Sequence, residues 1–347
     1  MSDSQVIPES YPVTFEPLDR TLDVPRGDTI LGAALGSGYP LAHSCRNGVC
    51  GACKAKIVAG SVDHGGSDQR GLSDAERREG YALLCQAKPL SALTVACKVV
   101  HAAEGVPVRR LACRVDRLER LADDVMRIRL RTAAKDRLAF LPGQYIDVLM
   151  NGGIRRSLSM ANSPDDDVFI ELHLRNYGGP FSTHVFNAMK VNDLLRLEGP
   201  MGTFFVRDDS DKPIIFVASG TGFAPIKSMI EHEVRKGSRR PMTLYWGARR
   251  PADLYLDELP HAWTDEYGVN YVPVVSDARP DDEWHGRTGF VHRAVMEDYP
   301  DLSGHQVYAC GAPVVVQAAL RDFTAACGLP EHEFHADMFV SSTPAPA

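Results

Sequence analysis

Four cysteines carry the most specific chemistry in this sequence. Cys45, Cys50 and Cys53 form a C-x4-C-x2-C run, and Cys85 lies further along the chain. Four thiolates at this spacing suit one [2Fe–2S] cluster, which carries a single electron at low potential. The sequence therefore predicts an electron-transfer protein whose metal ligands are Cys45, Cys50, Cys53 and Cys85.

The residues between these cysteines support a cluster-binding loop. Three thiolates converge on one cluster only if the loop curls tightly, and Gly48 and Gly51 permit the positive φ angles that a tight curl needs. Backbone N–H groups that point inward can then donate hydrogen bonds to the sulfur atoms. A zinc site or a set of buried free thiols is the alternative, but zinc knuckles favour two C-x2-C pairs, and this sequence has only one.

Length and composition limit the class of protein. The chain has 347 residues, which is enough for two or three domains, and its 44% hydrophobic and 24% charged residues are typical of a soluble globular protein. The net charge of −7 argues against a nucleic-acid partner, because phosphate binding needs a basic surface. No apolar run reaches the length of a membrane span, and residues 1–10 lack the pattern of a signal peptide. We therefore expect a cytoplasmic protein with no membrane partner.

The first segment of the chain has the pattern of a small α+β domain. Residues 28–31 resemble a capped helix start, and residues 73–76 fit a capping box that opens a second short helix. Residues 13–15, 54–58 and 93–99 are predicted to be short strands.

Residues 109–207 form a second segment that is rich in alternating strand patterns. The clearest of these patterns lie at residues 126–130, 144–150 and 168–174, with glycine and proline turns between strands. Such a segment predicts an antiparallel barrel.

The third segment alternates strands with helices. Residues 214–218 are continuously apolar, as in a strand buried in a parallel sheet. Further strands are predicted at residues 243–246, 271–275 and 307–310, with helical stretches between them. This alternation predicts a doubly wound α/β domain.

Two motifs in the second segment suit a phosphate-bearing cofactor. Arg156 follows a strand and a Gly-Gly turn, and its guanidinium group can bind a phosphate through two hydrogen bonds. Residues 178–183 place two glycines before a helix predicted at residues 181–189, and a helix N-terminus of this kind is a natural pyrophosphate site. Each motif alone is weak, but the two lie close together in the sequence of one β-rich domain.

One motif in the third segment suits a dinucleotide. Residues 219–225 follow the buried strand and open a helix predicted at residues 226–235, so that glycines and a helix N-terminus can approach a pyrophosphate. Pro225 suits the first turn of that helix. Arg249 or Arg250, after the next strand, can bind a ribose 2′-phosphate, and an exposed charge pair is the alternative.

These motifs together resemble the ferredoxin–NADP reductase superfamily. Residues 156–159 (Arg-Ser-Leu-Ser) resemble its R-x-Y-S flavin motif, and residues 199–204 resemble its G-P-x-G-x-F segment. Residues 220–225 resemble its G-T-G-x-A-P motif, and residues 310–313 resemble its C-G-x-P segment. Leu158 departs from the pattern, because the family usually has an aromatic residue there that stacks on the flavin ring. Leucine covers the ring with less contact area, so unusual flavin affinity and potential are expected.

The resemblance implies a set of site residues. Ser159, near flavin N5, and Cys310, near the nicotinamide, are the expected catalytic residues. Phe334 and Phe339 are both candidates for the aromatic residue on the second flavin face, and Phe339 is chosen. The expected flavin-binding residues are Arg156, Ser157, Leu158, Ser159, His173, Leu174, Gly179, Ser182, Thr183 and Phe339. The expected residues for the nicotinamide nucleotide are Gly220, Thr221, Gly222, Ala224, Pro225, Arg249, Cys310, Gly311 and Pro313.

The order of the segments resembles the modular reductases of benzoate dioxygenase, phenol hydroxylase and toluene monooxygenase. It implies a multidomain protein with an α+β ferredoxin (β-grasp) domain at residues 1–102, an antiparallel β-barrel FAD domain at 109–207 and a doubly wound α/β NAD domain at 208–340. Electrons would pass from NADH (with NADPH as the alternative donor) to FAD, to the [2Fe–2S] cluster and then to an oxygenase component or its ferredoxin. A reductase for a CDP-6-deoxyhexose dehydrase and a flavin-less ferredoxin-like carrier are the alternatives, and a monomer is expected.

Overall fold

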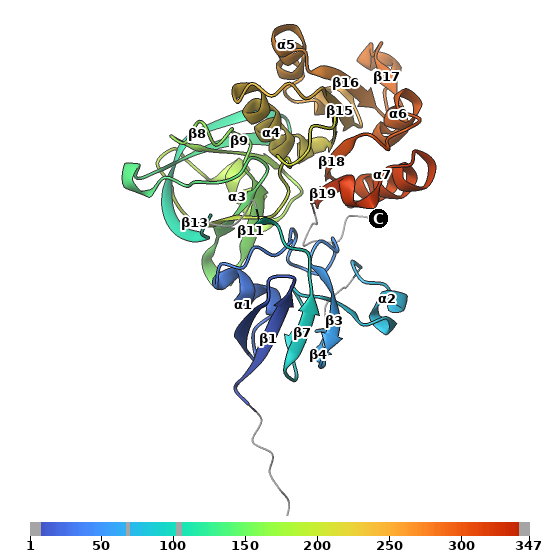
Figure 1. Ribbon diagram of the computed structural model, residues 1–347. Helices are drawn as coiled ribbons and strands as arrows, with labels where there is room; N and C mark the ends of the chain where they lie inside the picture. Colours follow the sequence, from blue (N-terminus) through green and yellow to red (C-terminus); the bar gives the residue numbers. More distant parts are fainter. Residues whose placement is uncertain (1–7, 67–69, 102–105, 340–347) are drawn as a thin grey trace, which may run out of the picture. The chain divides into compact units, whose positions relative to one another are not determined.

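The computed structural model describes residues 8–66, 70–101 and 106–339. The chain divides into two compact units, residues 1–108 and residues 109–347. The first unit contains a mixed sheet, and the second contains a barrel followed by a parallel sheet (Figure 1). The predicted fold classes are confirmed, whereas the limits predicted at residues 102 and 340 lie outside the described residues and the domain boundaries stay a prediction.

The first unit is a β-grasp fold, in which a helix packs on a five-stranded sheet. The sheet has the order β2-β1-β7-β3-β5, with β1 and β7 parallel and the other neighbours antiparallel. Val13 and Phe15 of the sheet pack in one buried core with Ile30 and Leu31 of the helix. The elements are β1 (Ser10–Glu16), β2 (Arg20–Pro25), α1 (Ile30–Gly36), β3 (Lys54–Ala59), β4 (Val62–Asp63), α2 (Asp74–Arg78), β5 (Tyr81–Leu83), β6 (Lys88–Pro89) and β7 (Leu93–Ala96).

Both predicted helix starts in this unit are confirmed by their caps. The Thr29 side chain accepts a backbone N–H of the first turn of α1 at 3.2 Å, and Ser73 and Glu76 form a reciprocal capping box on α2. Strand β7 ends earlier than predicted, because Val99 leaves it to form a separate bridge with Leu41.

The second unit begins with a six-stranded antiparallel barrel. Its strand order is β11-β10-β13-β8-β9-β12, and a bridge between Met160 and Leu172 joins the two outer strands. Ile128, Ile146 and Val148 fill the interior and are fully buried. The elements are β8 (Arg109–Ala122), β9 (Val125–Thr132), β10 (Tyr145–Leu149), β11 (Arg155–Ser159), β12 (Ile170–Arg175), α3 (Pro180–Asn187) and β13 (Leu194–Met201).

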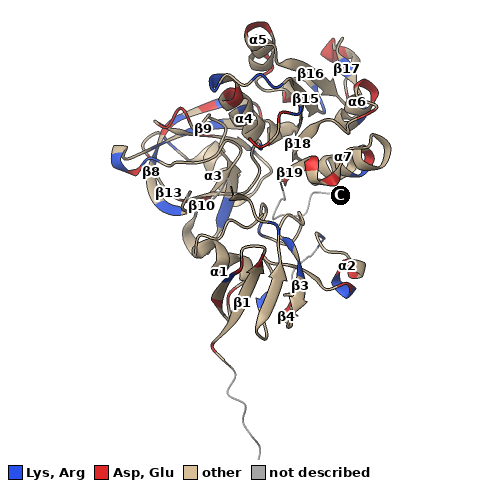
Figure 2. Ribbon diagram, in the orientation of Figure 1, with Lys and Arg blue, Asp and Glu red and all other residues tan. Residues whose placement is uncertain are grey.

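Arginines occupy alternate positions along β9 of the barrel, at residues 127, 129 and 131 (Figure 2). Their side chains are held by carboxylates on neighbouring strands, as opposite charges across a sheet stabilise each other. Arg127 lies 2.5 Å from Glu119, and Arg129 lies 3.2 Å from Glu171. Glu171 is buried, so this pair brings a charge into the interior of the unit.

A parallel six-stranded sheet completes the second unit. Its order is β17-β16-β15-β14-β18-β19, so the direction of winding changes between β14 and β18, and ligands of such sheets bind beside this switch point. Helix α4 begins at Phe223, earlier than predicted, because the short 3-10 turn η4 leads directly into it. The elements are β14 (Ile214–Ser219), η4 (Gly220–Gly222), α4 (Phe223–Arg235), β15 (Met242–Ala248), α5 (Glu258–Tyr267), β16 (Asn270–Val275), β17 (Arg287–Thr288), α6 (Val291–Asp298), β18 (Gln306–Gly311), α7 (Pro313–Ala326) and β19 (Phe334–Met338).

Candidate functional site

The cysteine loop lies between α1 and β3 in the first unit. Its backbone has positive φ angles of 88° at Gly48 and 76° at Gly51, as the tight curl predicts. Cys53 comes directly before β3, and Cys85 follows β5, the strand that pairs with β3. The sheet therefore brings Cys85 to the loop.

The four thiols are arranged as two pairs. The Cys45 and Cys50 side chains hydrogen-bond each other, and so do those of Cys53 and Cys85. The hydrogen bond from Cys50 lowers the pKa of Cys45 to about 5, and the hydrogen bond from Cys53 likewise lowers the pKa of Cys85. The four sulfur atoms are thus held at the loop as two neighbouring pairs.

These pairs fit a cluster with two irons. A [2Fe–2S] cluster needs two thiolates at each iron, as the two pairs supply. The Cys50 N–H already points at the Cys45 sulfur from 3.4 Å, which matches the N–H···S bonds that tune such clusters.

Sequence reasoning did not assign a role to Gln86 beside this loop. Its amide nitrogen lies 3.8 Å from the Cys85 sulfur and donates to the Arg46 carbonyl at 3.2 Å. Gln86 thus ties the fourth ligand to the loop of the other three, and its place next to Cys85 was the only signal.

The predicted phosphate ligands of the barrel lie together. A Cβ placed on Gly179 would lie 3.5 Å from the Arg156 guanidinium, so glycine leaves open space beside that group. Gly179 precedes α3, whose first turn has no side-chain cap, and Ser182 donates to the Gly179 carbonyl at 3.0 Å. With Thr183 also in the first turn, the arginine, the glycine and the helix N-terminus suit the phosphates of FAD.

The predicted flavin residues of strand β11 point to two different faces, because side chains alternate along a strand. Leu158 shares the face of Arg156 and packs half-buried against the barrel core. Ser157 points to the other face, where its hydroxyl donates to Asp147 at 2.6 Å. Ser159 ends the strand and is buried.

His173 and Leu174 are both buried in β12. The two ring nitrogens of His173 are occupied, one by the Tyr255 hydroxyl and one by Glu171, each at 3.1 Å. Burial lowers the pKa of His173, so the ring is neutral. Any contact of His173 with flavin would therefore use its backbone.

The two nicotinamide motifs touch at the switch point of the sheet. A Cβ on Gly222 would lie 2.1 Å from the Cys310 carbonyl oxygen, and one on Gly311 would lie 2.4 Å from the Ser219 carbonyl oxygen. Only glycine permits this approach. Thr221, Ala224 and Pro225 continue the motif through η4 into α4, which suits a pyrophosphate at the helix N-terminus.

The structure separates the two candidate aromatic residues. Phe339 follows β19 and donates its N–H to the Gly311 carbonyl at 2.9 Å, whereas Phe334 lies at the opposite end of β19. Cys310 is fully buried, and burial raises the pKa of its thiol. The thiol is therefore neutral, and Pro313 begins α7 beside it.

The structure also separates the two arginines after β15. Arg250 is committed to Asp282, with nitrogen–oxygen distances of 2.7 and 2.5 Å. Arg249 is exposed, and no ion pair of it occurs within the described ranges. Arg249 is thus the one of the two that can meet a ribose.

Sequence reasoning missed Arg175, which ends β12. Its guanidinium is buried, lies 3.4 Å from both Asp124 and Asp253, and would be 3.9 Å from a Cβ on Gly220. A buried cation beside the pyrophosphate loop suits anion binding. Its position at the end of a continuous buried strand was the available signal.

Comparison with known proteins assigns each part of the chain. Residues 13–90 match the 2Fe-2S iron-sulfur cluster binding domain family, residues 112–206 the oxidoreductase FAD-binding domain family and residues 216–321 the oxidoreductase NAD-binding domain family. The cofactors are therefore a [2Fe–2S] cluster, FAD and NADH. Among the described residues, no helix is both long and apolar enough to cross a membrane.

Whole-chain relatives extend this assignment. The CDP-6-deoxy-L-threo-D-glycero-4-hexulose-3-dehydrase reductase of Yersinia pestis is 41% identical over 90% of this chain and 94% of its own. The reductase component DmpP of phenol 2-monooxygenase from Pseudomonas sp. strain CF600 is 36% identical over 90% of this chain and 89% of its own. The crystal structure of the Amycolatopsis reductase GcoB is 32% identical, covers 96% of this chain and 100% of its own, and has a TM-score of 0.80. The chain belongs to the modular flavin oxidoreductases of the ferredoxin–NADP reductase type that carry a [2Fe–2S] ferredoxin domain.

Proposed function

We propose that this protein is the reductase component of an oxygenase and delivers single electrons from NADH to that separate component. The observation that carries the proposal is the arrangement of four cysteines in the first unit, where Cys45 pairs with Cys50 and Cys53 pairs with Cys85. An enzyme that only exchanged hydride between NADH and a substrate would not need a one-electron carrier in the same chain.

Different residues of the second unit would bind the flavin phosphates, the flavin ring and the nicotinamide. When bound, FAD accepts two electrons from NADH and the cluster accepts one at a time. Arg156 and the first turn of α3 hold the flavin phosphates, and Leu158 covers the ring. Ser159 would donate a hydrogen bond near flavin N5, while Cys310 would pack as a neutral thiol at the nicotinamide.

The nucleotide is held from two sides. Residues 220–225 bind the pyrophosphate through backbone N–H groups and the α4 N-terminus. Arg249 would bind the adenosine ribose, and Phe339 would cover the second face of the flavin. No general acid or base is needed, because a hydride carries its own electron pair.

A deoxyhexulose dehydrase is the second candidate acceptor. It is favoured by the 41% identity to the Yersinia reductase, whereas the 36% identity to DmpP favours a monooxygenase. A flavin-less carrier is not supported, since residues 112–206 match an FAD-binding family and Arg156 adjoins Gly179.

An anaerobic NADH titration with visible spectroscopy tests the electron path. Flavin and cluster bands that bleach together, with about three electrons per chain (two in flavin, one in the cluster), would support it. Cluster bands that NADH leaves unchanged would contradict it.

A reconstitution then tests the acceptor. The reduced protein is mixed with purified oxygenase components and, separately, with a deoxyhexulose dehydrase, and NADH consumption is compared with product formed. Product with an oxygenase alone supports the leading proposal, and product with the dehydrase alone replaces it.

The cellular setting and the oligomeric state belong to the same proposal. All eight cysteines are free, which suits the reducing cytoplasm. A monomer predicts a solution mass near 38.0 kDa by light scattering, and twice that mass would contradict it.

A further inference from the structure

Helix α4 carries a second set of polar residues just beyond its nicotinamide motif. Lys227 and Ser228 lie in its second turn, and both side chains are buried. An α-helix rises about 1.5 Å per residue, so Ser228 is only about 9 Å along the axis from Gly222.

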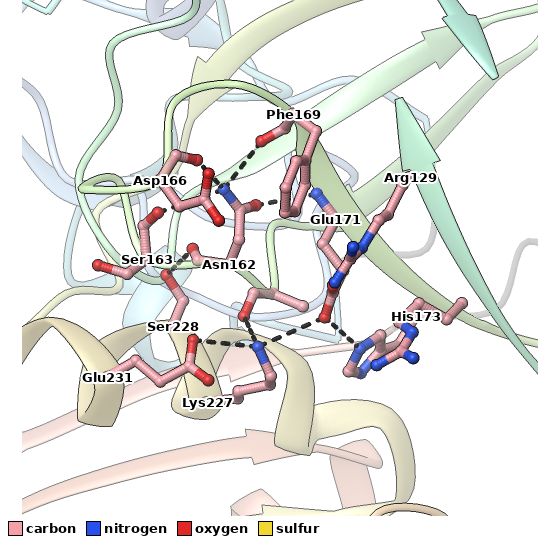
Figure 3. Close-up of polar contacts among 12 residues, drawn as sticks. Arg129, Asn162, Ser163, Asp166, Phe169, Glu171, His173, Lys227, Ser228 and Glu231 are labelled. Atoms are coloured by element: carbon pink, nitrogen blue, oxygen red, sulfur yellow. Dashed lines mark hydrogen bonds and ion pairs between the residues drawn. The ribbon is translucent and has the colours of Figure 1, made fainter. Parts of the chain in front are cut away.

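Both side chains bind the segment that continues the flavin strand. The Lys227 ammonium group donates to the Ala161 carbonyl at 3.0 Å, and the Ser228 hydroxyl donates to the Asn162 carbonyl at 2.7 Å (Figure 3). These two carbonyls lie within three residues of Ser159. The helix that carries the nicotinamide motif is therefore joined directly to the segment that follows strand β11.

The barrel side of this joint is itself fixed. The Asn162 amide nitrogen donates to the carbonyls of Asp166 and Phe169 at 2.9 and 3.0 Å, and its amide oxygen accepts the Glu171 N–H at 2.9 Å (Figure 3). The segment after β11 is thus held by β12 and its preceding turn rather than being a free loop.

A buried charge network holds the ammonium group in place. Lys227 lies 3.0 Å from Glu231 of its own helix and 3.4 Å from Glu171 of β12. Glu171 also contacts Arg129 and His173, and all of these groups are drawn in Figure 3. A buried ammonium group is tolerated only when it is paired in this way, so its position is defined from both sides.

We propose that Lys227 and Ser228 are positioning residues for hydride transfer, which set the nicotinamide-binding end of α4 against the flavin-binding strand β11. This inference rests on the proposed function. It assigns these residues to the alignment of donor and acceptor and not to the retention of either cofactor. A misplacement of about 1 Å lowers an enzymatic rate by up to about 10²-fold, so a joint this close to both motifs controls the rate.

Two substitutions and a matched control test the inference in the full-length, cofactor-loaded protein. Lys227→Met removes the ammonium group, and Ser228→Ala removes one hydroxyl with little disturbance of packing. Lys236→Met is the control, because Lys236 forms ion pairs at the other end of the same helix, with Asp208 and Glu233.

Stopped-flow mixing with NADH measures flavin reduction and the long-wavelength absorbance of the stacked nicotinamide–flavin pair. In both variants we expect flavin reduction at saturating NADH to slow by about 10- to 100-fold and that absorbance to fall, while the FAD content and the NADH dissociation constant stay within about threefold. Hydrogen exchange at residues 160–163 should be faster in Ser228→Ala, independently of turnover. The control should behave like the unmodified protein.

Each other outcome overturns the inference. Reduction at the unmodified rate in Ser228→Ala, an equal loss in Lys236→Met, or loss of FAD from Ser228→Ala would show that the joint does not align the cofactors. Failure of the unmodified protein to be reduced by NADH would instead overturn the proposed function, so the two failures are distinguishable.

Discussion

At the scale of single residues, neighbours in sequence have opposite roles because they face opposite sides of a strand. Arg156 adjoins Gly179 at the start of α3, whereas Arg155 lies 3.5 Å from Asp147 and also pairs with Glu198. The two arginines offer the same charge and size, but only Arg156 reaches the proposed phosphate site. A comparison of variants at Arg155 and Arg156 therefore shows whether FAD binding depends on the position of the arginine or only on its charge.

Arg156→Ala should release FAD. A hydrogen bond to a charged group contributes about 1.5–3 kcal/mol, so the FAD dissociation constant should rise about 10- to 100-fold. The measurement is the FAD-to-protein ratio after gel filtration, together with a fluorescence titration of the apoprotein. Arg155→Ala is the control and should retain FAD, and equal loss from both variants would argue against the assignment of Arg156.

At the scale of elements, the nicotinamide site depends on contact between η4 and β18. Gly222→Ala should separate them, because the new methyl group would lie 2.1 Å from the Cys310 carbonyl oxygen. Overpacking of this kind costs about 1–3 kcal/mol, and we expect weaker NADH binding and a lower melting temperature. Gly304→Ala is the control, since no atom lies within 4 Å of its Cβ. Unchanged NADH affinity in Gly222→Ala would contradict the proposed loop.

The buried pair of His173 and Glu171 in β12 should give this unit a pH-dependent stability. Burial lowers the pKa of His173, so the folded protein keeps the ring neutral where the unfolded chain protonates it, below about pH 6.5. The unfolded state then binds more protons, and the unfolding free energy decreases as the pH falls from 7 to 5, by at most about 1.4 kcal/mol per pH unit.

Glu171 acts in a lower pH range. Burial alone would raise its pKa, but the hydrogen bond from His173 and the charge of Lys227 outweigh burial and hold the pKa well below its usual range. Its contribution is present above the ordinary carboxyl pKa and disappears only as the pH falls through the lowered value. The slope between pH 7 and 5 therefore contains the contribution of His173, together with those of His292 and His305, whose pKa values burial also lowers.

Urea unfolding followed by tryptophan fluorescence measures this slope, because Trp246, Trp263 and Trp284 all lie in the second unit. His173→Gln should make the slope shallower by the share that His173 contributes. A variant at the exposed His261 should keep it, and a slope that His173→Gln leaves intact would contradict the argument.

At the scale of the whole molecule, the electron path crosses from the second unit to the first. The first unit holds the four thiols, and the second holds both nucleotide sites. Loss of the cluster should therefore stop the path after the flavin without affecting the flavin or NADH sites.

Cys85→Ser should abolish NADH-driven reduction of the natural acceptor while NADH still reduces the flavin and a small oxidant such as hexacyanoferrate(III). Anaerobic spectra and the two acceptor assays measure this split. Cys97→Ser is the control, because Cys97 is a free thiol of the same unit outside the two pairs. Loss of both activities in Cys85→Ser would show that the second unit depends on the first.

The sequence by itself determined the cofactors, the fold classes and most of the elements. Cysteine spacing, glycine motifs and strand alternation are local patterns, and so are the caps at Thr29 and Ser73. Such patterns state which chemistry a segment can perform and which element carries it.

Only the tertiary structure decided which distant segments meet at the proposed site. It paired the thiols, bound Arg250 to Asp282, placed Phe339 beside Gly311, and joined Lys227 to the segment after β11. Each of these choices is a contact between segments distant in sequence. Local periodicity contains no information on such contacts, because they depend on strand order and on how helices pack against the sheet.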